Sequence, residues 1–524
     1  MKKTHAVMGF TAAFLMVFST AVYANVKPAT IFNSNMVLQR EKMVPVWGAA
    51  TPGEQIEVTF NGQTLKTKAD ADGKWEVTLA PMKVNAKGQD MVLKGKNTVT
   101  LKNILVGDVW LCAGQSNMEM TMGSRVTDGN KHMKESAKYP LIRRVKIAHS
   151  HAPEEIDNVA IANNQNWSVC GPAVIRTYTA AGYYFARRIH IETGVPIGIL
   201  DNNWGGSPIQ PFIPAIGYKD IPQLQKEWKM LQAFIPGTPE YAKRVQNNIA
   251  AVNKWIKKAE AAVKAGKQTP TFPAINYLPV AGSRYNAMMA PIVRFPIKGA
   301  LWYQGCANWR SGMEYYHMMH ALVKGWRTVW KDDFPFYFVQ LAAFLKATND
   351  PKGGNGYAEI REVQRKAMDI PKSGMACAID IGMENDIHPK NKYDVGERLA
   401  LWALRDVYGK KDVVVSGPLF KSMEIKGNQA IVSFDYADGL MTAKKTGTAK
   451  PVAVNAKPAH FAIAGADKVW YWADAKIEGG KVILSHAKVA KPVAVRYAYR
   501  TYPTGVNMYN AAGLPMVPFR TDNW

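Results

Sequence analysis

Residues 110–118 read WLCAGQSNM, an apolar run that stops at Gly114 and is followed by a single serine, Ser116. The run from Ile104 to Cys112 is short and rich in branched and aromatic side chains, which predicts a buried strand. A serine just past the end of such a strand exposes its hydroxyl where backbone N–H groups converge, as nucleophilic serines do. The stretch lacks the Gly-x-Ser-x-Gly pattern and also fits an ordinary loop serine, so other residues must decide.

The start of the chain has the pattern of an export signal. A charged segment, Met1 to His5, is followed by an apolar run from Ala6 to Val22 and by the small residues Val22 and Ala24. This order predicts a signal peptide over residues 1–24, cleaved after Ala24, and hence a periplasmic or secreted protein. No later apolar run reaches the ~18 residues that cross a bilayer, so we expect no membrane span.

Composition limits the possible partners. The 524 residues include 66 Lys and Arg against 41 Asp and Glu, a formal charge of +25. Export and the lack of a basic-aromatic recognition motif argue against a nucleic-acid partner. The charge fits approach to acidic glycans or anionic surfaces, or solubility alone. The four cysteines allow three full disulfide pairings, and none has the Cys-x-x-Cys spacing typical of structural zinc.

Two β-rich segments are expected at the ends of the mature chain. Residues 25–103 alternate apolar and polar side chains around Asn61-Gly62 and Asp72-Gly73, two type I′ turn signals, which predicts an antiparallel β-sandwich. Alternation returns over residues 411–524, where Gly479-Gly480 separates two strand-like runs. We expect a second β-sandwich-like domain there.

Residues 104–410 have a different rhythm, in which strands alternate with helices. Apolar strands are expected at 104–112, 195–200, 297–303, 336–341 and 375–381, and helices at 177–192, 313–330, 357–368 and from about 390 to 408. This order predicts a five-stranded parallel sheet covered on both faces. Residues 217–283 form a helical insertion, whose long helix has Thr238 as N-cap, Pro239 at its first position and Gly266 at its end.

Ligands bind beyond the carboxyl ends of the strands of such a sheet. The strand ends present Ser116, Gly205-Gly206, Gln304 with Asn308, and Asp386 with His388. Serine is a poor nucleophile at its free pKa, so it needs a base such as His388 to take its proton and a carboxylate such as Asp386 to hold the imidazole. The set is typical of a hydrolase.

We expect no metal and no cofactor. The pairs His149/His151 and His317/His320 lack nearby carboxylate or thiol companions that would complete a site.

Four ordered motifs make a family resemblance specific. They are WLCAGQSNM at 110–118, WGGSPI at 204–209, WYQG at 302–305, and DIHPKNK at 386–392 followed by Val395, Gly396, Arg398, Leu399 and Ala400. With the ending GLPMVPFRTD at 513–522, the chain resembles the sialate O-acetylesterase family of SGNH hydrolases. The resemblance covers most of the mature chain.

The resemblance implies a three-layer flavodoxin-like SGNH domain that needs no metal and removes O-acetyl groups from carbohydrate. It makes Ser116 the nucleophile and His388 the base. It also implies an oxyanion hole formed by the amides of Ser116 and Gly206 with the side chain of Gln304.

The chain departs from the family pattern at two places. The family usually has Gln-Gly-Glu-Ser-Asn after the third strand, whereas Cys306 and Ala307 stand here in place of Glu and Ser. The triad Asp commonly lies three residues before the His, a position occupied here by Asn385. We therefore expect Asp386 to orient His388 imperfectly, so that Ser116 and His388 act partly as a catalytic dyad.

The sequence favours an exported esterase acting on O-acetylated sialic acid through an acetyl-enzyme. An acetylesterase for plant polysaccharide, xylan or pectin, remains open, as does a carbohydrate-binding relative without turnover. We expect Gln115, Asn117, Asn308 and Arg284 to bind substrate. A basic residue near Ser116 would suit the carboxylate of sialic acid, and Arg284 and Arg176 are the candidates. The sequence does not indicate the oligomeric state.

Overall fold

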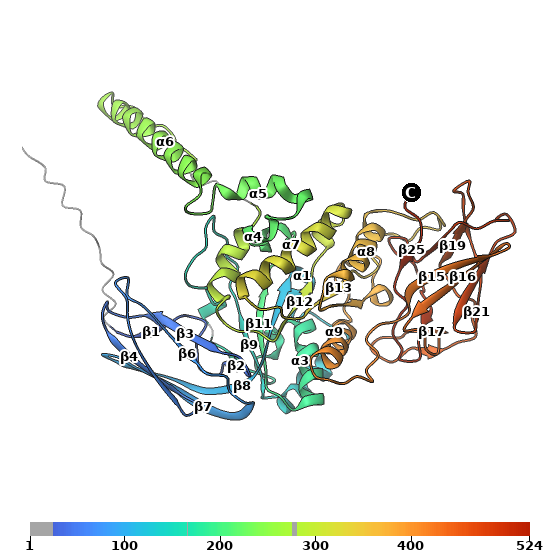
Figure 1. The fold of residues 1–524 in the computed structure, drawn as a ribbon, viewed down its shortest axis with the longest axis horizontal. Coiled ribbons are helices and arrows are strands. Elements are labelled where there is room, and N and C mark those ends of the chain that lie inside the picture. Colours follow the sequence, from blue (N-terminus) through green and yellow to red (C-terminus); the bar gives the residue numbers. More distant parts are fainter. Residues whose placement is uncertain (1–24, 165, 275–279) are drawn as a thin grey trace, which may run out of the picture.

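The computed structural model describes residues 25–164, 166–274 and 280–524. An α/β part lies in the middle of the molecule, between a β-rich part from the start of the chain and another from its end (Figure 1). The expected signal peptide, residues 1–24, lies outside the described residues. No helix in the described ranges is long and apolar enough to cross a membrane.

The central sheet contains the strands that the sequence predicts. They are β8 (Thr98–Gly114), β11 (Ile197–Asn203), β12 (Gly299–Tyr303), β13 (Phe336–Gln340) and β14 (Ser373–Cys377). They run parallel in the order β11-β8-β12-β13-β14. After β8 the chain builds first to one side and then to the other, so a topological switch point lies beside the end of β8 that leads to Ser116.

The sheet has a further strand that was not predicted, β9 (Ile142–Lys146). It pairs in parallel with β11 and antiparallel with β10 (Ser168–Val169). Its sequence is IRRVK, and the two arginines hide the apolar pattern of a buried strand. Both arginines have partners: Arg144 pairs with Asp201 of β11 at 2.7 Å, and Arg143 donates to the carbonyl of Pro140.

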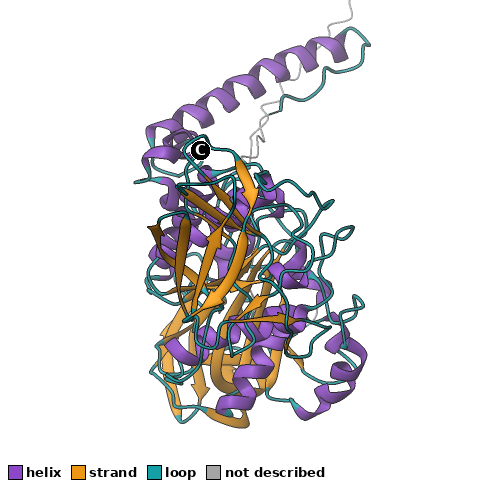
Figure 2. Cartoon of the chain, turned by 90° about the vertical axis from the view of Figure 1, so that its right-hand side faces the viewer, coloured by secondary structure: helices purple, strands orange, loops and turns teal. Residues whose placement is uncertain are grey.

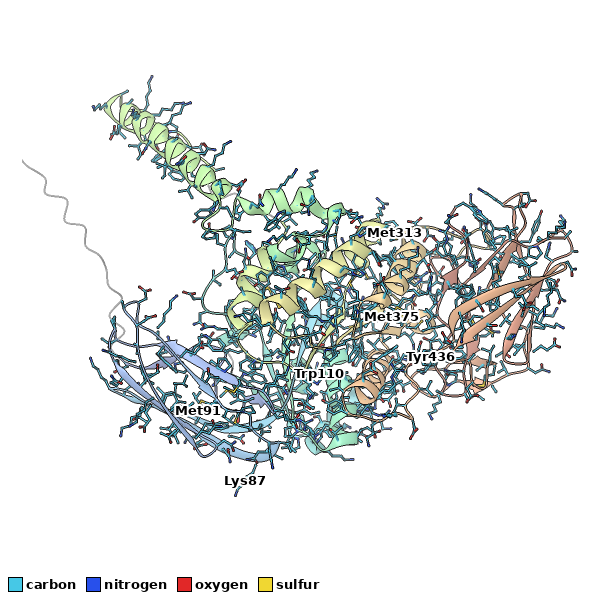
Figure 3. All side chains as sticks on the ribbon, in the orientation of Figure 1. Lys87, Met91, Trp110, Met313, Met375 and Tyr436 are labelled. Atoms are coloured by element: carbon cyan, nitrogen blue, oxygen red, sulfur yellow. The ribbon has the colours of Figure 1, made fainter. Side chains whose placement is uncertain are left out.

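Helices cover both faces of this sheet, which gives the predicted three layers (Figures 1 and 2). On one face, α3 (Ala180–Thr193) packs against α9 (Lys392–Asp406). On the other lie α4 (Ala215–Tyr218), α7 (Met313–Trp330) and α8 (Gly356–Lys366). Between the layers, Trp110 of β8 and Met375 of β14 are fully buried (Figure 3).

The N-terminal part contains β1 (Lys27–Pro28), β2 (Val37–Gln39), β3 (Val44–Ala49), β4 (Gln55–Phe60), β5 (Gln63–Lys68), β6 (Lys74–Leu79) and β7 (Asn85–Lys94). Asn61-Gly62 joins β4 to β5 as a hairpin, with positive φ at both residues as a type I′ turn requires. Asp72-Gly73 does not make the second expected hairpin, because β6 leaves β5 and pairs with β3 in the other sheet. The limit expected at 103/104 falls inside β8, which pairs with β7 over its first half and with β11 over its second.

The C-terminal part is built from short antiparallel strands. They are β15 (Leu419–Lys426), β16 (Gln429–Asp435), β17 (Met441–Lys444), β18 (Val452–Ala453), β19 (Phe461–Ala464), β20 (Trp470–Trp472), β21 (Asp474–Glu478), β22 (Lys481–Ser485), β23 (Ala494–Tyr497), β24 (Met508–Tyr509) and β25 (Phe519–Arg520). Gly479-Gly480 connects β21 to β22 as a hairpin. The strand-like run expected before it, residues 469–472, corresponds to β20, so β21 itself was not predicted.

The insertion contains α5 (Gln225–Gln232) and α6 (Pro239–Lys264), and α6 projects from the body in both views (Figures 1 and 2). Thr238 caps α6 by accepting from the Tyr241 N–H, and Gly266 follows its end with positive φ, as predicted. Its apolar stripe is not covered: Ile249, Ile256 and Val263 are 54%, 40% and 66% exposed.

The four cysteines, all within the described ranges, form none of the three possible pairings. Cys112, Cys170, Cys306 and Cys377 are free and buried, which raises the pKa of each thiol.

Candidate active site

Ser116 is presented by the end of the longest strand. Gly114 closes β8 with φ +136°, and a side chain there would meet the Tyr303 carbonyl oxygen at 2.3 Å. The short helix α1 (Ser116–Glu119) begins at once, so Ser116 lies at its first position. Among the described residues, the Ser116 N–H has no acceptor and therefore remains available to a ligand.

His388 reaches Ser116 from the other end of the α/β part. It lies in the loop before α9, and its Nε2 is 2.8 Å from Ser116 Oγ although 272 positions separate the two residues. Burial lowers the pKa of His388, and the positive charge of Lys392 lowers it further. At neutral pH the imidazole is therefore uncharged and can accept the serine proton.

Asp386 lies near His388 but holds it loosely. Its Oδ1 accepts the backbone N–H of His388 at 2.8 Å and is 3.4 Å from His388 Nδ1, too long for a good hydrogen bond. Its Oδ2 pairs with Lys390 at 2.9 Å. The backbone N–H of His388 and the charge of Lys390 lower the pKa of Asp386, so the carboxylate is ionised. Asn385, at the usual place of the triad Asp, is exposed.

The backbone N–H groups of Ser116 and Gly206, which we expect in the oxyanion hole, have no acceptor among the described residues. The loop after β11 brings Gly205 against Ser116: a Cβ at Gly205 would lie 3.5 Å from Ser116 Cβ. Gly206 is exposed, with φ +69°, and its N–H has no acceptor in the described part of the chain. Gln304 is fully buried, and its amide donates to Ser207 O and Asn308 Oδ1. Both hydrogens of the Gln304 amide are therefore bonded inside the protein, and its part in the oxyanion hole stays a prediction.

Three of the residues expected to bind substrate are used inside the protein. Gln115 Oε1 accepts the N–H groups of Gly305 and Ala307. Asn308 Oδ1 accepts the Ile209 N–H and the Gln304 amide, and its Nδ2 donates to Gln210 and Ser311. Asn117 Nδ2 donates to the Ile387 carbonyl at 3.0 Å. All three side chains are at most 4% exposed, so they brace the rim instead of facing substrate.

Lys392 is a buried partner of Asn117 that had no predicted role. Its Nζ donates to Asn117 Oδ1 at 2.5 Å and lies 4.9 Å from the centre of the Tyr303 ring. Burial lowers the pKa of Lys392 to about 7. Asn117 thus links the helix of Ser116 to the loop of His388.

Glu119 is a second polar residue at the site with no predicted role. Its Oε2 accepts the Gly205 N–H at 2.6 Å, and its Oε1 is 2.6 Å from His149 Nε2 and 3.4 Å from Lys146 Nζ. The carboxylate therefore fixes the backbone of the Gly205-Gly206 loop beside Ser116. The position of Glu119, three residues after Ser116 on one helical turn, was the available signal.

Trp204 forms a wall beside these groups. The His149 ring stacks on it, with centroids 4.6 Å apart, and the Arg284 guanidinium lies 4.3 Å from its centroid. Arg284 is the one expected substrate-binding residue that the protein leaves without an internal hydrogen bond among the described residues. Arg176 is exposed. Within the described ranges, no three His, Cys, Asp or Glu side chains are grouped so as to hold a metal ion.

Comparison with known proteins identifies the class. A family model described as carbohydrate esterase, sialic acid-specific acetylesterase, matches residues 274–405, which include His388. The structure of a carbohydrate acetylesterase from Xanthomonas citri superposes with a TM-score of 0.76 at 32% identity, covering 95% of this chain and 100% of that one.

Curated relatives agree over most of the chain. Sialate O-acetylesterase of Rattus norvegicus is 28% identical over 453 residues, covering 80% of each protein. The Mus musculus enzyme of the same name is 27% identical over 542 residues, covering 94% of this chain and 93% of the relative. With its three-layer fold, the protein is a carbohydrate esterase. More specifically, the chain belongs to the sialate O-acetylesterase family of SGNH hydrolases.

Proposed function

We propose that this esterase removes O-acetyl groups from acetylated sialic acid, with Ser116 as nucleophile and His388 as general base. The observation that carries the proposal is the 2.8 Å contact between Ser116 Oγ and His388 Nε2. The lowered pKa of His388 supports it, since the base must be neutral to accept a proton. The names of the matched family and of the mammalian relatives support sialic acid as substrate.

The reaction follows from this geometry in two halves. His388 Nε2 takes the Ser116 proton while Oγ attacks the acetyl carbonyl, and the carbonyl oxygen gains negative charge between the N–H groups of Ser116 and Gly206. The tetrahedral intermediate collapses as His388 gives its proton to the departing sugar oxygen, which leaves an acetyl-enzyme. Water then attacks the acetyl group with His388 again as base, and acetate and free Ser116 result.

Hydrolysis of p-nitrophenyl acetate tests the nucleophile. We expect Ser116→Ala to lose about 10⁶-fold in kcat, the size seen when the serine of a serine protease is removed. Ser124→Ala, an exposed serine that bonds only to Thr121 among the described residues, should retain the wild-type rate. Undiminished turnover by Ser116→Ala would overturn the assignment.

The substrate is tested by acetate release from 9-O-acetylated sialic acid, acetylated xylan and acetylated pectin. We expect the highest kcat/KM with sialic acid. A clear preference for xylan or pectin would make the protein a plant-polysaccharide esterase. Binding of acetylated sugar without acetate release would instead favour a carbohydrate-binding relative.

A further inference from the structure

Arg284 carries an unpaired charge at the edge of the site. It lies just before the short helical turn η6 (Tyr285–Met289) and is half-buried. No carboxylate among the described residues pairs with it, and its Nη1 is buried without an acceptor. Burial alone lowers the pKa of this guanidinium. An unpaired, partly desolvated charge is costly, so its presence needs a reason beyond stability.

The aromatic residues around Arg284 fix its position. The guanidinium carbon lies 4.3 Å from the centre of the Trp204 ring and 5.7 Å from that of Phe212. Such contacts hold a guanidinium by cation–π attraction without using its hydrogen-bond donors. Nη1 is buried without an acceptor, and Nε and Nη2, which share one edge of the guanidinium, are not among the fully buried unbonded atoms of the described residues.

Trp204 connects this arginine to the reacting centre. The backbone N–H of Trp204 donates to the Gly114 carbonyl at the end of β8, and the next residue, Gly205, lies against Ser116. Trp204 thus contacts Arg284 through its ring and adjoins, in the chain, the glycine that lies against the predicted nucleophile. A sugar with its acetyl group at Ser116 would extend along this wall.

Glu119, the carboxylate near Trp204, does not pair with Arg284. Glu119 has one oxygen on the Gly205 N–H and the other on His149 and Lys146, so its charge is already compensated. The free charge on this side of Ser116 is therefore positive.

We propose that Arg284, held by Trp204, binds the carboxylate of an acidic sugar whose O-acetyl group is cleaved at Ser116. This inference rests on the proposed function and adds the group that selects the substrate. The planar edge of a guanidinium matches the two oxygens of a carboxylate. Sialic acid and the uronic acid of pectin both carry that group, whereas xylose lacks it.

The test compares an acidic substrate with its own neutral form. Wild-type enzyme is measured on 9-O-acetylated sialic acid and on the methyl ester of the same compound, with acetate as readout. We expect the ratio of kcat/KM between free acid and methyl ester to fall by about 10- to 100-fold in Arg284→Met, mainly through KM, the size of one charge-assisted pair. Acetylated pectin fragments serve as the second acidic substrate and acetylated xylan as the neutral one.

Arg310→Met is the matched control. Arg310 also lies 4.3 Å from a tryptophan ring, that of Trp309, but is exposed, and its removal should leave the ratio unchanged. Arg284→Lys keeps the charge without the flat edge and should lose part of the ratio, which also covers the case that Arg284→Met does not fold.

Equal rates of wild-type enzyme on free acid and methyl ester would overturn the carboxylate subsite. So would an equal loss on both substrates in the Arg284 variants. Either result leaves the proposed function intact, because the Ser116→Ala test with p-nitrophenyl acetate does not involve a carboxylate on the substrate. A lost preference for acetylated pectin but not for sialic acid would place a uronic acid at Arg284 and contradict Arg284 as the group that binds the carboxylate of sialic acid.

Discussion

Ser116 lies between two regions that use their polar groups in opposite ways. On one side, the amides of Gln115, Asn117, Gln304 and Asn308 are at most 4% exposed and all bond inside the protein. On the other, Trp204 is only partly buried and holds an arginine that has no internal partner among the described residues. The first region fixes the shape of the rim, and the second is left to meet substrate.

The two regions differ in how deeply their polar side chains are buried. The amide side is covered by the loops and helices that follow β12, so an unbonded amide there would cost free energy. On the Trp204 side, Trp204 and Arg284 are only partly buried and Gly206 is exposed, so a charged group there can remain without an internal partner. Three substitutions test this comparison.

Asn117→Ala should have the largest effect. It removes the link between the helix of Ser116 and the Ile387 carbonyl next to His388, and leaves the buried Lys392 without its acceptor. We expect kcat for p-nitrophenyl acetate to fall by about 10²-fold, as small misplacements of reacting groups do. The free energy of unfolding should fall by about 2 kcal/mol in a denaturant titration.

Asn253→Ala makes the same chemical change on the exposed surface of α6 and serves as the control. It should leave kcat at the wild-type value and change the free energy of unfolding by no more than about 0.5 kcal/mol. If Asn117→Ala retains wild-type kcat, the amide side does not brace the reacting pair.

Glu119 gives the second prediction, because it braces the open side. Glu119→Ala removes the acceptor of the Gly205 N–H, so the Gly205-Gly206 loop can move away from the oxyanion. We expect kcat to fall by about 10-fold, less than the loss of a whole oxyanion donor. Glu119→Gln keeps an acceptor oxygen and should recover most of that loss, with KM for p-nitrophenyl acetate unchanged in both variants.

A purely electrostatic role for Glu119 makes a different prediction. In that case Glu119→Gln, which also loses the charge that faces His149 and Lys146, would be as slow as Glu119→Ala. Matching rates in the two variants would refute the positioning role.

The sequence sufficed for the layers and for the strand ends that carry Ser116 and His388. Apolar runs, the Thr238 cap and the Asn61-Gly62 turn are local signals, and the structure has each of them in place. The strand β9 was missed because the arginines of IRRVK find partners only in the folded state. The hairpin predicted at Asp72-Gly73 was wrong, because a local turn signal does not determine the partner of the strand that follows it, and β6 pairs with β3.

The roles of polar residues at the rim were harder to predict. Gln115, Asn117, Gln304 and Asn308 stand at strand ends, which is where substrate-binding side chains also stand. Which way an amide points depends on groups far along the chain, such as Ile387 for Asn117 and Ser207 for Gln304. Likewise, the absence of a partner for Arg284 in the described chain is a property of the folded neighbourhood and has no local sequence signal.

Asp386→Asn should have the smallest effect of the three. In serine proteases, replacing the orienting Asp by Asn lowers kcat by about 10⁴-fold. Here Asp386 Oδ1 is 3.4 Å from His388 Nδ1, and its bond to the His388 backbone N–H can be kept by Asn, so we expect less than about a 10-fold loss.

The pH profile gives Asp386→Asn a second readout. The negative charge of Asp386 raises the pKa of His388 against the larger lowering by burial and Lys392. Without that charge His388 loses its proton more easily, so the acid limb of kcat/KM should move to lower pH. A loss near 10⁴-fold would show that Asp386 orients the imidazole as a full triad member does, and that this side of the rim depends on charge as well as on buried amides. An acid limb that moves to higher pH would contradict the effect of the Asp386 charge on His388.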